Sequence, residues 1–514
     1  MLKLKDIHLG TIDAKNDLLY CTPDEIKQFE LSFVTPPSLK IEDYFSRRKY
    51  YVVGLKGTGK TALLRYISLE LDKESNSTST FVLFKSDIDE DLRKDFAKAA
   101  RVQLAEENSS DYDGNDFETV WRWFIYRKIS GSIQESNAKL FQQNDHLSKF
   151  LALVSSESVK PEDRKGLARL IPRIRKGNIE ICQSPKLSLE FDWDEHGRAN
   201  VNFNELVRRA DYEFEHLEVG TGRLNVFFDE LEISYQTAKQ YQRDSRLVRD
   251  LIVSVEKLNA VAKRKSYNFC IYAAIRSEVL SSVDSLGKEI NKPITDFGSS
   301  ILWNRTAVDA AQQPLLHIIE KRVNNAREKA GLNRLEASEL WKQYFPAFIN
   351  DKRPQVYILH NSWYRPRDII RLLISVQDQC PDDESFALHG IEAIRKSYST
   401  ASWVEITEEL KTKYRPSDID GIKYIFYGYR QISSLQDLLE RSENTAKEHK
   451  QTALLLENHR LREILKDLYR IGVIGNINQS RNRIRFSFRG DDEILFDLNI
   501  FLHNALKAHL SVFK

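Results

Sequence analysis

One short segment constrains the fold more than any other part of this 514-residue sequence. It reads Gly54-Leu55-Lys56-Gly57-Thr58-Gly59-Lys60-Thr61 and matches the pattern G-x4-G-K-[ST]. The apolar residues 50–53 before it predict a strand, and the apolar spacing of residues 61–71 after it predicts a helix. Residues 81–84 predict a second strand. The sequence therefore predicts a β-α-β unit with a glycine-rich turn after its first strand.

A turn of this kind suits the binding of phosphate groups. Glycines let backbone N–H groups turn inward around an anion, and the start of the following helix adds its dipole. We expect Lys60 to reach the β- and γ-phosphates of a nucleotide and Thr61 to offer its hydroxyl to a magnesium ion. The pattern thus predicts ATP and Mg²⁺ as cofactors in a P-loop. The expected nucleotide contacts are Gly54, Gly57, Thr58, Gly59, Lys60, Thr61 and Ala62.

Hydrolysis of the nucleotide needs a carboxylate at the end of a neighbouring buried strand. Residues 224–228 predict such a strand, and Asp229 and Glu230 follow it directly. We expect Asp229 to hold the magnesium ion through water and Glu230 to orient and polarise the attacking water. The alternative interpretation is a solvated acidic turn that also includes Glu232.

Arg276 follows a further predicted strand, residues 268–275. In a parallel sheet this places its guanidinium on the side of the phosphates, where it would sense the γ-phosphate and act in catalysis. The alternative interpretation is an ion pair with a surface carboxylate.

Two more arginines flank Pro366, which suits the first turn of a helix. Arg365 or Arg367 would fold over the nucleotide from a helical lid, and the sequence does not choose between them. In the alternative they are solvated arginines at a capped helix. Arg305 is a weaker candidate, as an arginine finger acting on a neighbouring subunit, with an ordinary surface position as its alternative.

The order of these patterns predicts an α/β P-loop NTPase core, a parallel sheet flanked by helices, with three additions: a helical insertion, a helical lid and a C-terminal winged-helix-like domain. We divide the chain into residues 1–89 (N-terminal segment and first part of the core), 90–218 (mostly helical insertion), 219–305 (second part of the core), 306–400 (lid) and 401–514 (C-terminal domain).

Four stretches carry a family resemblance: GLKGTGKTAL, VFFDELE, AAIRSEV and WYRPRDIIRLL, in this order. Together they resemble AAA+/STAND-type bacterial P-loop ATPases, including the origin-recognition branch, in which a lid and a winged helix follow the core. In STAND proteins the strand after the acidic motif often ends in arginine, as at Arg276, and this favours a switch over a processive motor. The long insertion at residues 90–218 departs from both groups.

Two basic groups are candidate contacts for DNA. The first is a cluster formed by Arg164, Lys165, Arg169, Arg173, Arg175 and Lys176. The second is a predicted β-hairpin over residues 474–488, where Arg483, Arg485 and Arg489 alternate with apolar residues. A solvated helix face and an ordinary half-buried hairpin are the alternatives.

Composition excludes several other classes of protein. The 77 basic and 75 acidic side chains nearly cancel, so the whole chain carries no strong field for nucleic acid or membrane. Cys21, Cys182, Cys270 and Cys380 form no CxxC pair, which argues against disulfides or zinc and favours the cytoplasm. No apolar run reaches the about 18 residues that span a bilayer.

The expected function is an ATPase that acts as a nucleotide-dependent assembly or conformational switch. The resemblance further implies bacterial antiphage defence, with a homo-oligomer or an effector protein as partner. Two alternatives remain open: a DNA-binding ATPase of the initiator or loader kind, and a scaffold that keeps ATP structurally.

Overall fold

The computed structural model describes most of the chain, in two compact units. The described residues are 2–14, 16, 22–106, 117–136, 139–157, 170–175, 178–187, 191–233, 237–284, 288–305, 308–411, 413–478, 483–491 and 493–513. Unit 1 comprises Met1–Leu39, Leu55–Ala62 and Ile301–Lys514, and unit 2 comprises Lys40–Gly54 and Leu63–Ser300. Over the described residues, no helix combines the length and the apolar character that crossing a membrane requires.

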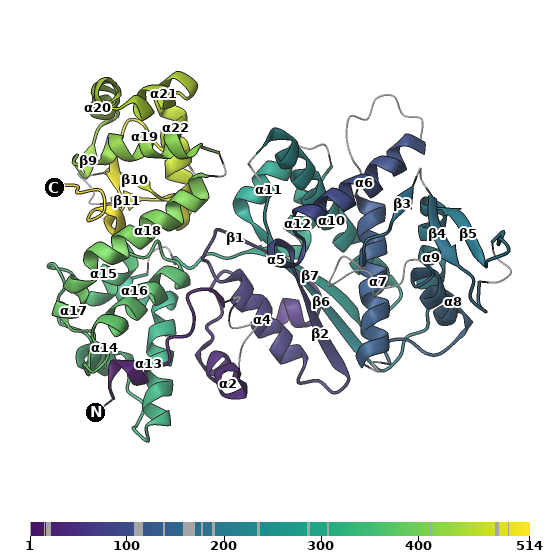
Figure 1. Ribbon diagram of the computed structural model, residues 1–514. Helices are drawn as coiled ribbons and strands as arrows, with labels where there is room; N and C mark the ends of the chain where they lie inside the picture. Colours follow the sequence, from purple (N-terminus) through teal and green to yellow (C-terminus); the bar gives the residue numbers. More distant parts are fainter. Residues whose placement is uncertain are drawn as a thin grey trace. The chain divides into compact units, whose positions relative to one another are not determined.

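A five-stranded sheet forms the centre of unit 2 (Figure 1). Its order is β2-β6-β7-β1-β8, and each strand runs parallel to its neighbours. The strands are β1 Tyr51–Gly54, β2 Ser77–Leu83, β6 Arg223–Leu231, β7 Phe269–Arg276 and β8 Gly298–Ser300. The first four confirm the strands predicted from apolar runs. Because parallel strands are buried on both faces, such runs mark them well.

The pairing register brings several strand ends to one edge of the sheet. Gly54, the last residue of β1, pairs with Arg276 of β7, and Leu83 of β2 pairs with Asp229 of β6. The register between β6 and β7 shifts between Phe228 and Leu231, which marks a β-bulge. The chain therefore leaves the sheet at Gly54 on the edge where β6 presents its acidic residues.

Helices and a second, smaller sheet complete unit 2. Its helices are α3 Glu42–Phe45, α5 Phe84–Asp87, α6 Glu90–Glu106, α7 Glu118–Ser136, α8 Asp145–Val154, α9 Phe203–Glu215, α10 Ala238–Arg264, α11 Ser277–Asp284 and α12 Asn291–Phe297, and α4 Lys60–Leu71 begins in unit 1. Within the expected helical insertion the structure adds an antiparallel sheet of β3 Ile174–Arg175, β4 Asn178–Cys182 and β5 Arg198–Asn202. These strands were not predicted as a sheet, because they are short and rich in polar residues.

A buried carboxylate ties helix α10 to the start of α7. Asp250 of α10 is fully buried and accepts a hydrogen bond from the backbone N–H of Phe117 at 2.8 Å. It also pairs with Arg249 at 2.8 Å and with Lys288 at 3.0 Å. A buried charge is stable only when paired and hydrogen-bonded, so these partners fix the packing of α10, which also contacts β7.

Unit 1 is mainly helical. Its helices are η1 Leu4–Asp6, α2 Pro23–Ser32, η4 Ala310–Gln312, η5 Pro314–Leu316, α13 His317–Lys329, α14 Ala337–Tyr344, α15 Pro354–His360, α16 Pro366–Gln379, α17 Leu388–Ala393, α18 Arg395–Leu410, α19 Pro416–Phe426, α20 Leu435–Glu448, α21 Lys450–Asn458, α22 Leu461–Ile471, η7 Ser487–Arg489 and η8 Asn504–Leu506. An antiparallel sheet of order β11-β10-β12-β9 lies among the last of them, with β9 Ile432–Ser433, β10 Ile474–Asn478, β11 Arg483–Arg485 and β12 Asn499–Leu502. The pairing of β10 with β11 confirms the predicted hairpin.

Candidate functional site

The glycine-rich segment joins β1 to α4 through a backbone that only glycine adopts easily. Gly57 has φ +81° and Gly59 has φ +93°, both in the left-handed region. A Cβ atom added at Gly57 would lie 3.3 Å from Cβ of Arg367 and 3.6 Å from Cδ of Arg365. Both positions thus require glycine for their backbone conformation, and Gly57 also because Arg365 and Arg367 pack closely against it.

Lys60 begins helix α4, and its side chain turns back onto the segment. Its Nζ donates a hydrogen bond to the carbonyl oxygen of Leu55 at 2.8 Å. Oγ1 of Thr58 donates to the same oxygen at 2.9 Å. Lys60 is only 9% exposed. Its ammonium group is therefore held against the backbone of the glycine-rich segment.

Trp303 supports the segment from a distant part of the chain. Its indole Nε1–H donates to the backbone oxygen of Thr58 at 2.9 Å, and the ring is buried. This contact could not be predicted, because it joins residues far apart in the chain and a buried tryptophan is usually part of a core.

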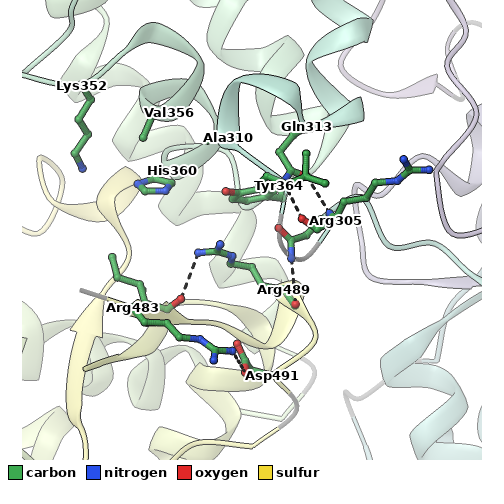
Figure 2. A pocket seen from close by; sticks show the side chains of 13 residues that line it. Arg305, Ala310, Gln313, Lys352, Val356, His360, Tyr364, Arg483, Arg489 and Asp491 are labelled. Atoms are coloured by element: carbon green, nitrogen blue, oxygen red, sulfur yellow. Dashed lines mark hydrogen bonds and ion pairs between the residues drawn. The ribbon is translucent and has the colours of Figure 1, made fainter. Parts of the chain in front are cut away.

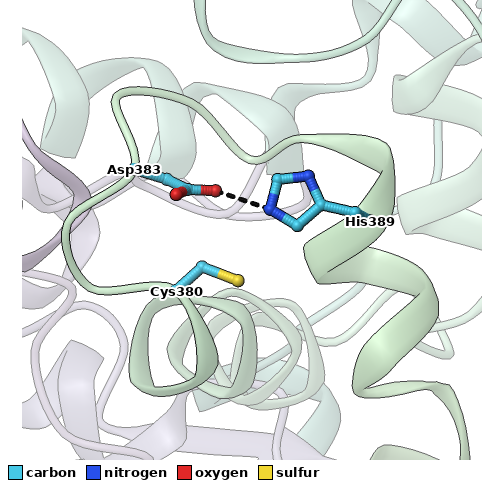
Figure 3. Close-up of side chains that lie close together, drawn as sticks. All are labelled: Cys380, Asp383 and His389. Atoms are coloured by element: carbon cyan, nitrogen blue, oxygen red, sulfur yellow. Dashed lines mark ion pairs between the residues drawn. The ribbon is translucent and has the colours of Figure 1, made fainter.

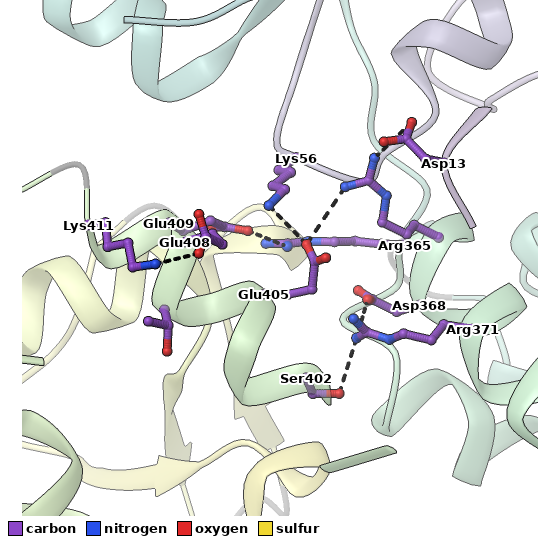
Figure 4. Close-up of polar contacts among 12 residues, drawn as sticks. Asp13, Lys56, Arg365, Asp368, Arg371, Ser402, Glu405, Glu408, Glu409 and Lys411 are labelled. Carbon is purple, nitrogen blue, oxygen red and sulfur yellow. Dashed lines mark hydrogen bonds and ion pairs between the residues drawn. The ribbon is translucent and has the colours of Figure 1, made fainter. Parts of the chain in front are cut away.

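Helices α16 and α18 add a polar network at the segment (Figure 4). Glu405 of α18 pairs with Lys56 at 2.9 Å and, more loosely, with Arg367 at 3.8 Å. Arg367 also faces Asp13 at 3.6 Å, and its backbone N–H donates to the oxygen of Gly57 at 3.4 Å. Burial alone would raise the pKa of Glu405, but the charges of Lys56 and Arg367 outweigh it and leave this pKa lowered.

The guanidinium of Arg365 points elsewhere. It pairs with Glu409 of α18 at 3.2 Å and donates to the backbone oxygen of Ile471 at the end of α22 at 3.3 Å. Arg365 is the N-cap of α16, and Pro366 occupies the first turn as expected. Both arginines border Gly57, but only Arg367 donates a backbone hydrogen bond to the segment among the bonds that the structure describes. The structure thus distinguishes two residues that the sequence left equivalent.

Asp229 and Glu230 lie within β6, which continues to Leu231 and does not end at residue 228 as predicted, at the point where its register with β7 shifts. Glu230 has φ +57°, an uncommon conformation for a side chain of this type, and its N–H donates to Oδ1 of Asp229 at 2.7 Å. Asp229 is buried, and Glu230 is partly exposed and accepts a hydrogen bond from Ser86 at 3.0 Å. Bulges often re-aim a side chain next to a functional site. Here Asp229 keeps its register with Leu83 of β2, and Glu230 adopts the positive φ.

Arg276 is engaged at the same edge of the sheet. Its guanidinium forms an ion pair with Glu232 and lies 3.9 Å from Glu278. Glu232 also pairs with Lys85 at 3.0 Å. The ion pair that was the alternative interpretation of Arg276 is therefore present, and a sensing role would require Arg276 to leave Glu232.

Arg305 and the hairpin arginines differ in exposure. Arg305 is exposed, and its backbone N–H and carbonyl oxygen hydrogen-bond to the side chain of Gln313. The side chain of Arg483 is 66% exposed, and Arg485 pairs with Asp491 at 3.0 Å. The expected outward alternation is wrong for Arg489. Strand β11 ends at Arg485, and in the 3-10 helix that follows Arg489 lies over the ring of Tyr364, 5.2 Å from its centre.

The other basic cluster lies largely outside the described residues, which exclude Arg164, Lys165, Arg169 and Lys176. Arg173 and Arg175 are described, and the backbone N–H of Arg173 donates to Glu157 at 2.8 Å. The structure therefore gives no shared face for this cluster.

Three residues of unit 1 offer a possible metal-ligand set (Figure 3). The sulfur of Cys380, a carboxylate oxygen of Asp383 and a ring nitrogen of His389 lie within 4.8 Å of one another. Thiolate, imidazole and carboxylate suit zinc. However, His389 already pairs with Asp383 at 2.8 Å and is exposed, so solvent and this ion pair account for the arrangement. We assign no metal to it.

Comparison with known proteins identifies one part of the chain. Residues 313–407 match the model of a protein family described as the FunZ-associated C-terminal helical domain. The match covers helices α13 to α17 and most of α18, including Arg365, Arg367 and Glu405. No curated protein matches the chain.

Proposed function

We propose that this chain is a P-loop ATPase that works as a nucleotide-dependent switch. The conformation of residues 54–61 is the observation that carries the proposal. Two glycines with positive φ follow a buried parallel strand, and a lysine at the start of the next helix folds onto the turn. Backbone N–H groups and a lysine at a helix N-terminus suit the β- and γ-phosphates of a nucleotide.

The acidic edge of the sheet supports hydrolysis. Thr61 would bind Mg²⁺ directly and Asp229 through water, while Glu230, turned by the bulge, would orient the attacking water. Arg276 would exchange its partner Glu232 for the γ-phosphate. The proposed cofactors are therefore ATP and Mg²⁺.

The network around Glu405 supports a switch. Lys56 and Arg367 are held by a carboxylate of α18 in the structure, and a bound triphosphate would compete for the same two cations. Helices α16 and α18 would then act as the lid, with Arg367 rather than Arg365 as the residue that senses the phosphates. Domain 401–514 would be the winged-helix-like part.

The setting and partners belong to the proposal as well. The resemblance to AAA+/STAND-type ATPases suggests cytoplasmic antiphage defence in bacteria, with a homo-oligomer or an effector protein as the partner. DNA is a second possible partner through the exposed Arg483.

The test measures magnesium-dependent ATP turnover and particle mass together, with and without mixed-sequence DNA. Lys60→Ala should abolish magnesium-dependent ATP turnover, because the lysine that would hold the β- and γ-phosphates is gone. Glu230→Gln should keep binding but lower turnover by about 10²- to 10⁴-fold, the usual effect of losing a general base. Particle mass should change with ATP in the wild type and stay constant in Lys60→Ala.

Matched controls are Lys73→Ala and Glu218→Gln. Lys73 follows the end of α4 and pairs with Glu70 of that helix. Glu218 is exposed and precedes β6. Both variants should behave like the wild type. Turnover that persists in Lys60→Ala would refute the proposed site, and ATP binding without turnover or mass change would favour a structural role for the nucleotide. Turnover stimulated by DNA would favour the initiator or loader function.

A further inference from the structure

A cavity in unit 1 is lined by cationic side chains (Figure 2). Its volume is about 690 Å³, and it lies between residues 304–364 and the 483–491 region. None of the residues of the glycine-rich segment lines it. We propose that this cavity binds a phosphate-bearing small molecule of mononucleotide size.

The charges in the cavity call for an anion. Among the described residues that line it, Arg305, Lys352, Arg483 and Arg489 are basic and Asp491 is acidic. Figure 2 shows Lys352 on one side, the guanidinium of Arg489 toward the middle and Arg483 beside Asp491, while the guanidinium of Arg305 points away. Asp491 is committed to the hairpin, because it pairs with Arg485 at 3.0 Å and only loosely with Arg483 at 3.5 Å. Guanidinium groups match the geometry of phosphate oxygens.

His360 adds a polar group without a partner. Its Nδ1 is buried, and no group in the described part of the chain hydrogen-bonds to it. A buried polar atom of this kind costs free energy unless a ligand or water satisfies it. Figure 2 shows the imidazole on the same side of the cavity as Lys352 and facing the region of Arg489.

Size and lining narrow the chemical class. Small-molecule pockets usually measure about 300–1,000 Å³, so this cavity is too large for inorganic phosphate alone and suits a mononucleotide. Val308, Val356 and Ile484 add apolar surface, and Tyr364 adds an aromatic ring. A molecule with a phosphate at one end and a flat, less polar group at the other can contact both the basic residues and the apolar and aromatic residues of the lining.

The experiment uses the full chain with Lys60→Ala, so that the proposed P-loop cannot contribute. Isothermal titration with AMP should give saturable binding at one site per chain. Adenosine should bind at least about tenfold more weakly, because it lacks the phosphate oxygens that would accept charge-assisted hydrogen bonds in the cavity. Adding Arg483→Ala or Arg489→Ala to this background should weaken AMP binding by about tenfold or more. Arg483 is exposed, so its variant should fold even if Arg489→Ala disturbs the packing on Tyr364.

Arg470→Ala is the matched control, because Arg470 is exposed in the same unit and does not line the cavity. AMP affinity should stay within about twofold of the background. Absence of saturable binding, equal affinity for adenosine and AMP, or an equal loss in Arg470→Ala would overturn the proposal. So would a short single-stranded oligonucleotide that binds far more tightly than AMP with the same dependence on Arg483, since that result indicates a nucleic-acid surface. All of these results are independent of whether the chain hydrolyses ATP.

Discussion

His360 carries a pH dependence that can be measured without any ligand. Burial, with help from Lys352 and Arg489, lowers the pKa of His360 from its usual 6.5 to about 4. Between these values the unfolded chain binds a proton that the folded chain does not bind. The stability that this histidine contributes is therefore complete above pH 6.5 and is lost as the pH falls toward 4.

We expect His360→Gln to lose less stability than the wild type on acidification. From pH 7 to pH 5, the free energy of unfolding of the wild type should fall by about 2 kcal/mol more than that of the variant, since each pKa unit corresponds to about 1.4 kcal/mol. Urea unfolding at the two pH values measures this difference. His389→Gln, which removes an exposed ion pair, should lose as much stability on acidification as the wild type. If His360→Gln also loses as much stability as the wild type, His360 is not the source of the pH dependence.

At the residue scale, the sequence predicted the groups whose positions follow from local chain geometry. Lys60 lies where it does because a strand, a glycine turn and a helix follow one another. Asp229 and Glu230 lie near the carboxyl end of a buried strand, which runs three residues further than predicted. The contact of Trp303 with Thr58 and that of Glu405 with Lys56 were not predictable in this way. They join residues that are far apart in sequence, and nothing in a single sequence specifies which distant helix reaches a loop.

Among the elements, helix α10 depends on a buried carboxylate. Asp250 accepts the N–H of Phe117 and pairs with Arg249 and Lys288. Asp250→Ala removes the buried acceptor of the Phe117 N–H and the carboxylate beside the buried Arg249, while Lys288 keeps its ion pair with Glu118. Loss of one partner of a buried ion pair usually costs about 3–5 kcal/mol. We expect a loss of this order in the free energy of unfolding of unit 2, measured by urea unfolding.

The matched control for this helix contact is Asp95→Ala. Asp95 lies on α6, its side chain is 41% exposed, and it pairs only loosely with Lys98, at 3.3 Å, among the contacts that the structure describes. Its loss should change the free energy of unfolding by less than about 0.5 kcal/mol. Similar unfolding curves for the two variants would show that Asp250 does not fix α10.

Apolar patterning predicted elements well where burial is complete on both faces. Strands β1, β6 and β7 were found for this reason. Strand β8, Gly298–Ser300, was missed because its three residues are small or polar and pair at an edge of the sheet. The hairpin was predicted correctly, but the alternation of outward arginines and inward apolar residues was wrongly continued to Arg489. Nothing in the sequence showed that β11 ends at Arg485 and that a 3-10 helix follows.

At the scale of the whole molecule, the proposed switch depends on the glycine-rich segment, whose residues are divided between the two units. Residues 55–62 belong to unit 1, whereas the strand before them and most of helix α4 belong to unit 2. A ligand that reorganises this segment therefore acts on a connection between the two units. The strongest restraint on the segment from α18 is Glu405, which holds Lys56 at 2.9 Å.

Removing this restraint should favour nucleotide binding. Glu405→Gln deletes the charge that competes with the phosphates for Lys56 and Arg367. Because partly exposed ion pairs contribute about 0.5–1 kcal/mol, we expect the Kd for ATP to fall by about two- to fivefold, measured by equilibrium titration with Mg²⁺ present. Glu408→Gln is the control on the same helix, since Glu408 is exposed and pairs with Lys411. An unchanged Kd in Glu405→Gln would mean that α18 does not restrain the segment, and a weaker Kd would mean that Glu405 itself supports the bound nucleotide.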